Sequence, residues 1–135
     1  MKQLWLVAAL SAGLHGQSPT EIFRLRSECG AIARQWQQDE EKHWPQGESG
    51  GIKTEGHYDP YSNRCYVKST MIDFPLDGMS LYDGQTQELL ASVGRLNDTH
   101  PVTEWGHIGA EEVKYGQANY ERVKAFMDDQ MRDNP

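Results

Sequence analysis

Residues 64–72 read Arg-Cys-Tyr-Val-Lys-Ser-Thr-Met-Ile, and this stretch decides the fold. Successive side chains of a β-strand point to opposite faces of the sheet. One face of this strand would carry Cys65, Val67, Ser69 and Met71. The other face would carry Tyr66, Lys68 and Thr70. Because residues 60–63, Pro-Tyr-Ser-Asn, form a turn by composition, we predict a strand over 64–72 whose buried face contains Cys65.

A second β-hairpin is predicted directly downstream. Its strands are residues 79–83 and 88–93, joined by the turn Gly-Gln-Thr at 84–86. Two other stretches lack a usable period. The glycine-rich residues 45–56 predict a flexible loop, and residues 97–109 predict irregular structure.

A long helix is predicted upstream, over residues 18–43. Ser18 can act as the N-cap, Pro19 suits the first helical position, and Glu21 can complete a capping box. Apolar residues then recur at intervals of three and four, at Ile22, Leu25, Cys29, Ile32 and Trp36. Pro45 ends the helix because the residue before a proline is pushed out of the helical region.

Helical spacing returns near the end of the chain, over residues 111–131. The predicted order is therefore a helix, several strands and a second helix, which favours an α+β fold. We expect a small antiparallel β-sheet of two hairpins packed against an N-terminal and a C-terminal helix, with both helices on one face of the sheet.

The first residues are typical of a secretory signal. Lys2 supplies a positive charge, and residues 4–14 form an apolar stretch that ends in small residues and is too short to span a bilayer. We predict a signal peptide at 1–16, a single domain at 17–135, and export to the periplasm or the medium without stable membrane insertion. A buried N-terminal helix is the alternative for this segment.

Export would place the two cysteines of the chain in a compartment where a disulfide can form. In an oxidising compartment, Cys29 and Cys65 have only each other as partners, so a disulfide between them is expected. The loop that it closes would stabilise the fold by about 3 to 4 kcal/mol on the chain-entropy view. A catalytic thiol is the alternative, but it requires a reducing compartment or a second thiol in a C-x-x-C spacing, and the chain has no such motif.

The charge of the chain bears on its partners. The 135 residues carry a formal net charge of -7. A surplus of carboxylates repels phosphate, so the composition disfavours nucleic acid and anionic lipid surfaces as partners.

Three short runs carry a family resemblance. They are His-Tyr-Asp at 57–59, Asn-Arg-Cys-Tyr-Val at 63–67 and Leu-Tyr-Asp at 81–83, preceded by a cysteine on a helix. In these runs the chain resembles a group of small exported bacterial proteins of unknown function, over about half of its length. The resemblance implies the cysteine bridge and the hairpins and supplies no catalytic residue. This chain lacks the later cysteine pair that some members have near the position of Trp105.

Candidate residues for chemistry gather in residues 100–107. His100, Glu104 and His107 lie within eight positions, and His57 could join them. The spacing matches no standard zinc motif, so we predict no metal and no cofactor. Serines occur at 62, 69, 80 and 92, but none lies in a G-x-S-x-G turn. Convergence of the histidines and Glu104 in a cleft would instead indicate a metal-binding protein or a small secreted hydrolase.

Three residues suggest a binding surface. If the face of Cys65 is buried, Tyr66 and Lys68 point outward, and Tyr82 on the next hairpin could join them in an aromatic patch. Such a patch could contact a protein or a sugar. The alternative is that these tyrosines are ordinary half-buried strand residues. We therefore expect a non-enzymatic binding module, most plausibly one with a protein partner in the envelope or the extracellular space.

Overall fold

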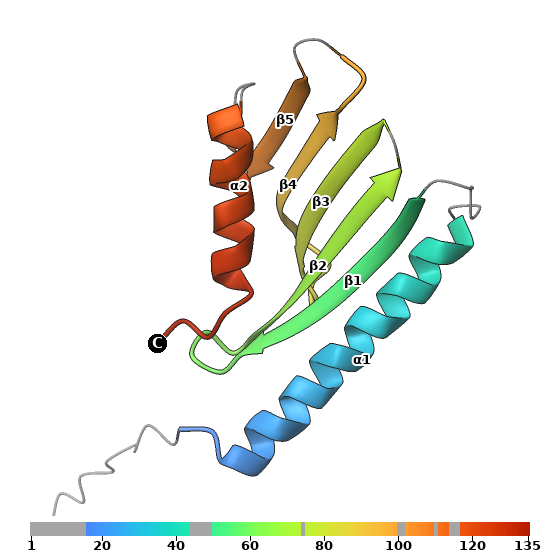
Figure 1. Ribbon diagram of the computed structural model, residues 1–135. Coiled ribbons are helices and arrows are strands. Elements are labelled where there is room, and N and C mark those ends of the chain that lie inside the picture. Colours follow the sequence, from blue (N-terminus) through green and yellow to red (C-terminus); the bar gives the residue numbers. More distant parts are fainter. Residues whose placement is uncertain (1–15, 44–49, 74, 100–101, 110, 114–116) are drawn as a thin grey trace, which may run out of the picture.

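The computed structural model describes residues 16–43, 50–73, 75–99, 102–109, 111–113 and 117–135. They form two helices and a six-stranded antiparallel sheet in which the strands follow one another in chain order, β1 to β6 (Figure 1). The bounds are α1 Pro19–His43, β1 Gly50–Asp59, β2 Arg64–Asp73, β3 Leu76–Asp83, β4 Leu89–Leu96, β5 Thr103–Ile108, β6 Glu111–Val113 and α2 Gln117–Gln130. The α+β class, with a helix before and after an antiparallel sheet, is confirmed.

Helix α1 begins where its capping sequence predicts. The Ser18 hydroxyl accepts a hydrogen bond from the backbone amide of Glu21 at 3.2 Å, and the Ser18 carbonyl accepts one from the amide of Ile22 at 2.9 Å. The bond to the hydroxyl satisfies one of the donors that the first turn of a helix leaves without a partner, and the bond to the carbonyl is the first intrahelical bond of α1. Cys29 and Ala33, from the middle of α1, are buried against the sheet.

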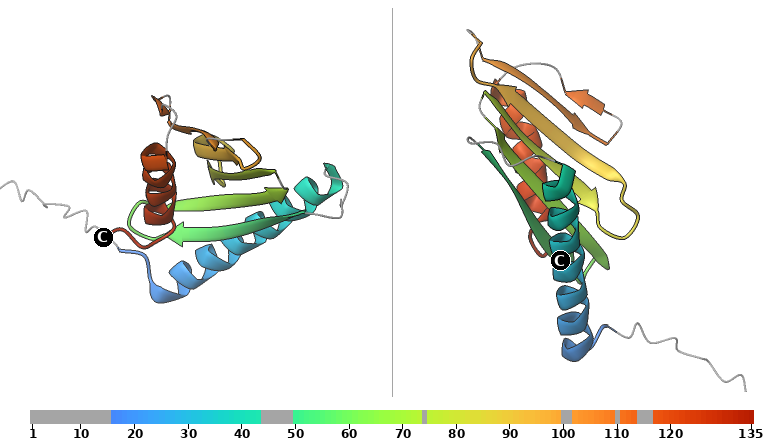
Figure 2. Two further views of the ribbon diagram at one scale, coloured as in Figure 1. Left: turned by 45° about the horizontal axis from the view of Figure 1, so that its top comes forward. Right: turned by 90° about the vertical axis from the view of Figure 1, so that its right-hand side faces the viewer.

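The two helices cover opposite faces of the sheet, so the expectation that both lie on one face is wrong (Figure 2). On one face, Cys65 and Val67 of β2 pack against α1. On the other face, Tyr66 packs in a cluster with Val123 and Met127 of α2. The reason is that β2 carries apolar side chains on both faces, and each face excludes water only when a helix covers it.

The disulfide between Cys29 and Cys65 is confirmed. It joins α1 to β2, with a Cα–Cα distance of 5.5 Å, and each cysteine is only 2% exposed. The described part of the chain contains no free cysteine.

The predicted loop at 45–56 is partly wrong, because Gly50 onward forms β1 and pairs with β2 along its whole length. Gly56 gives the physical reason. A Cβ atom at this position would lie 2.8 Å from the carbonyl oxygen of Cys29 and 2.9 Å from the Cβ of Ala33. The glycine is therefore required by the close approach of α1 to the strand rather than by a turn.

The predictions for residues 97–109 and 111–131 are also partly wrong. Residues 103–108 form β5 in antiparallel pairing with β4, and residues 111–113 form β6 beside it. Helix α2 begins only at Gln117. The backbone N–H and C=O groups of these short segments find hydrogen-bond partners by adding strands to the sheet. The hydrophobic periodicity of a single segment does not reveal such pairing.

The turn between β1 and β2 is organised around the buried carboxylate of Asp59. This carboxylate accepts hydrogen bonds from the Ser62 hydroxyl at 2.7 Å and from the backbone amide of Tyr61 at 3.1 Å. It also accepts a longer one, at 3.5 Å, from the backbone amide of Asn134. Burial raises the pKa of Asp59, but these bonds outweigh it and hold the pKa below its usual value. The C-terminal tail is thereby joined to the turn, and Asn63 completes it with a positive φ of 53°.

The predicted signal peptide lies almost entirely in residues 1–15, outside the described residues. Within the described ranges, neither helix combines the length and the apolar character needed to cross a bilayer.

Candidate functional site

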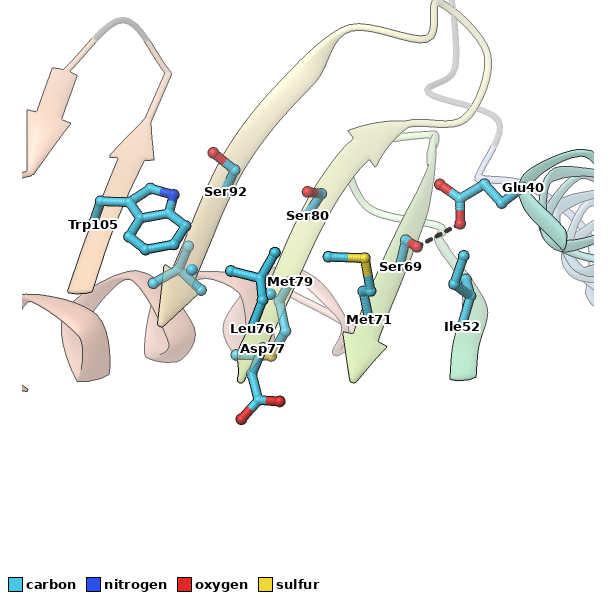
Figure 3. A pocket seen from close by; sticks show the side chains of 13 residues that line it. Glu40, Ile52, Ser69, Met71, Leu76, Asp77, Met79, Ser80, Ser92 and Trp105 are labelled. Atoms are coloured by element: carbon cyan, nitrogen blue, oxygen red, sulfur yellow. Dashed lines mark hydrogen bonds between the residues drawn. The ribbon is translucent and has the colours of Figure 1, made fainter. Parts of the chain in front are cut away.

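A groove lies on the face of the sheet that α1 shares. Helix α1 packs along β1 and β2, and beyond it the same face of β3, β4 and β5 lines a groove of about 260 Å³ (Figure 3). Glu40 of α1 forms one wall, and Trp105 of β5 lies at the far end. The helix and the tryptophan therefore enclose a strip of sheet surface that no described element covers.

Strand register places a polar and an apolar row side by side along this face. Residues directly opposite one another in an antiparallel pair share a face. The polar row crosses the strands in the order Ser69, Ser80, Ser92 and His107. The apolar row runs beside it in the order Ile52, Met71, Gly78, Gly94 and Trp105. The groove is therefore amphipathic across its width.

Trp105 lies against the bare backbone of Gly94. A Cβ atom at position 94 would be 2.4 Å from Cζ2 of the indole ring. The ring can occupy this place only because residue 94 has no side chain, yet Trp105 remains 38% exposed. The result is an aromatic surface held in place by the sheet and open to a ligand.

The wall formed by α1 is fixed by hydrogen bonds through Glu40. One carboxylate oxygen accepts the Ser69 hydroxyl at 2.7 Å, and the other accepts the indole N–H of Trp36 at 3.2 Å. The Trp36 ring in turn packs on Tyr82, with the ring centroids 4.6 Å apart. Glu40 is thereby held in one orientation at the edge of the groove.

Three polar groups along the groove have no hydrogen-bond partner within the described part of the chain. Among the described residues, nothing forms a hydrogen bond with the hydroxyls of Ser80 and Ser92 or with the indole N–H of Trp105. Hydroxyls can donate and accept, and the indole N–H donates. The floor and end of the groove therefore offer both kinds of hydrogen bond to a ligand.

The charge of the groove excludes one class of ligand. Among the described residues, the charged ones that line it are Glu40 and Asp77, and no described lysine or arginine does so. Figure 3 shows the Asp77 carboxylate pointing away from the other lining side chains, and it accepts a hydrogen bond from Asn97 at 2.7 Å. A single negative group, Glu40, therefore faces the groove and disfavours phosphate and other anions.

A larger hollow of about 570 Å³ lies between α1 and the β3–β4 turn. Its polar lining residues on α1 bond to one another: Gln35 donates to the Asp39 carboxylate at 3.0 Å, and the His43 ring contacts the Asp39 carbonyl at 2.6 Å. Because these groups already have partners, this hollow offers less to a ligand than the groove does.

The predicted patch of Tyr66, Lys68 and Tyr82 does not form. Tyr66 is 4% exposed beneath α2, and the Lys68 ammonium pairs with Asp128 of α2 at 3.0 Å. Tyr82 lies on the opposite face, against α1. The expectation is wrong because it assumed that the face of β2 opposite Cys65 is exposed to solvent, whereas α2 covers that face.

The histidines and Glu104, whose convergence would have indicated a metal-binding protein or a hydrolase, are dispersed as far as they are described. Glu104 and His107 are three residues apart in β5 and therefore point to opposite faces. The buried Glu104 pairs with Arg95 at 2.9 Å, and His57 lies 3.3 Å from a carboxylate oxygen of Asp133. His100 lies outside the described residues, and within those residues no three His, Cys, Asp or Glu side chains are placed to hold a metal ion.

In the sequence, Ser80 and Ser92 are candidates only as nucleophiles, and Trp105 has no role. The large Trp105 and His107 alternate with Gly106, a spacing that indicates one face of a β-strand. The two serines come near Trp105 only through strand register, for which no single segment carries a signal. Comparison of the chain with known protein families, curated proteins and solved structures found no match.

Proposed function

We propose that this protein is a non-enzymatic binding module and that its ligand lies in the groove between α1 and Trp105. One observation carries the proposal: an exposed indole ring held against Gly94 lies beside serine hydroxyls that have no hydrogen-bond partner among the described residues. Binding sites commonly combine apolar surface with a few polar groups that orient the ligand, and this groove has both.

We also propose that the protein works in the periplasm or outside the cell, where it meets its ligand or a protein partner. The buried bond between Cys29 and Cys65 supports an oxidising compartment. The charge pattern of residues 1–16 and the resemblance to small exported bacterial proteins point to the same compartment.

A hydrolase is the second candidate, and one observation favours it. Ser92 and His107 are direct cross-strand neighbours on the open face, where Cβ atoms are about 4.5 to 5.5 Å apart. No hydrogen bond joins them, and within the described residues no third group orients the imidazole. Hydrolysis of p-nitrophenyl acetate that is lost in Ser92→Ala and kept in Ser80→Ala would favour this candidate over the binding module.

The binding proposal is tested by ligand-detected NMR of the purified, oxidised protein with mixed libraries of small sugars, peptides and amines. Hits are then measured on Trp105→Ala and on Phe23→Ala, a matched control whose exposed ring lies on α1 outside the groove. We expect hits that Trp105→Ala weakens and Phe23→Ala leaves unchanged. Hits that respond equally to both variants, or to neither, would place binding elsewhere and refute the proposal.

A further inference from the structure

We infer that the groove binds a neutral oligosaccharide, with one sugar ring stacked on Trp105. This inference rests on the proposed binding function and names the chemical class of the ligand. The ligand must combine an apolar face with an edge of hydrogen-bonding groups, because the groove places its apolar row directly beside its serine row.

A pyranose ring meets this requirement in one unit. Its C–H groups form an apolar face that packs on the electron-rich face of an indole ring. Its hydroxyls project around the rim and can each donate or accept. Ser80 and Ser92 can also do both, so either partner can adjust to the other.

The length of the groove requires more than one ring. Glu40 contacts Ser69 on β2, whereas the ring of Trp105 lies over Gly94 on β4. Two strand spacings separate these strands, a distance of about 9 to 10 Å, which exceeds the width of one sugar ring. A single ring on Trp105 would leave the Glu40 end empty, whereas a chain of rings can span both ends.

The charge of the groove limits the sugar to neutral types. Glu40 faces the groove, and in the part of the chain that the structure describes no basic side chain lines it. Sulfated sugars and sugar acids would therefore meet repulsion without a compensating cation. A neutral ring can instead donate its hydroxyl protons to the carboxylate, although both carboxylate oxygens already accept one bond each.

A protein segment suits the groove less well. The backbone groups of β3 and β4 are already paired with strands on both sides, so an added strand cannot extend the sheet there. Stable protein interfaces involve about 20 to 30 residues on each partner, whereas 13 described residues line the groove.

The test uses isothermal titration of the purified, oxidised protein with chitotriose, cellotriose, maltotriose and mannotriose. Sialyllactose serves as the anionic probe, and a library of short peptides serves as the alternative ligand class. We expect at least one neutral trisaccharide to bind and the anionic probe not to bind. We expect Trp105→Ala to weaken binding at least about ten-fold and Ser92→Ala about two- to ten-fold.

Gly94→Ala provides a second variant. Its methyl group would displace the ring of Trp105 from its place on the sheet, although Trp105 and the serines are all retained. It should weaken binding as Trp105→Ala does, and Phe23→Ala should not. Thermal melts show whether each variant is folded. If peptides or sialyllactose bind through Trp105 and no neutral sugar binds, the neutral-saccharide inference is overturned, whereas the proposed binding function stands. Absence of any Trp105-dependent ligand would overturn both.

Discussion

Removal of the bond between Cys29 and Cys65 is expected to lower the free energy of unfolding by about 4 kcal/mol. The cysteines are 36 residues apart, and closing a loop of that size restricts the unfolded chain by about this amount on the chain-entropy view. Domains of this size have a total stability of about 5 to 15 kcal/mol. The bridge would therefore account for a large part of the stability of this fold.

The position of the bridge determines how it must be removed. Both cysteines are 2% exposed, between α1 and β2. A reductant reaches the sulfur atoms only when the helix opens away from the sheet, so reduction of the native protein should be slow. The bond is best removed by reduction in denaturant followed by refolding, or by the double variant Cys29→Ala/Cys65→Ala.

Urea unfolding followed by circular dichroism measures the effect. With a slope of about 2 kcal/mol/M for a chain of this size, the midpoint should fall by about 2 M on reduction. The double variant is the control, because adding reductant to it should change nothing. A midpoint shift below about 0.5 M with an unchanged slope would show that the bridge is not a main source of stability.

Three further outcomes are expected. Arg95→Met should cost about 3 to 5 kcal/mol in urea unfolding because it leaves the buried Glu104 carboxylate without its ion-pair partner, and Arg95→Met/Glu104→Gln should recover much of that loss. Gly56→Ala should cost about 1 to 3 kcal/mol because its methyl group meets the backbone of α1, whereas Gly51→Ala, with open space around its Cβ, should stay within about 0.5 kcal/mol. Because the pKa of Asp59 is lowered in the fold, the stability that its carboxylate contributes is complete above the ordinary carboxyl pKa of about 3.9 and is lost as the pH falls through the lowered pKa. In thermal melts between about pH 2 and 6, the melting temperature of Asp59→Asn should therefore fall less on acidification than that of the unchanged protein.

The elements that the sequence predicted well are those that local signals define. Ser18 and Pro19 mark the start of α1, and alternation in residues 64–72 predicts β2. The pairing of the cysteines followed from their number, given an oxidising compartment. Each of these conclusions needs only a few neighbouring residues or a count.

The candidate site was not predictable in the same way. Gly56 and Gly94 look like loop residues in the sequence, but each is needed because another part of the chain approaches its backbone, α1 at one position and Trp105 at the other. Ser80 and Ser92 become neighbours only through the register of β3 and β4. A groove lined by residues of five strands and a helix leaves no pattern within any one segment.

The sequence by itself determined the α+β class, the first helix, the hairpin of β3 and β4 and the cysteine bridge, because capping, periodicity and cysteine number act over short distances or by elimination. Only the tertiary structure decided which face each helix covers. Strand β2 has apolar side chains on both faces, and α2 covers the face of Tyr66 while α1 covers only part of the other. Long-range packing thus buried the predicted binding patch and left the groove beside Trp105 open.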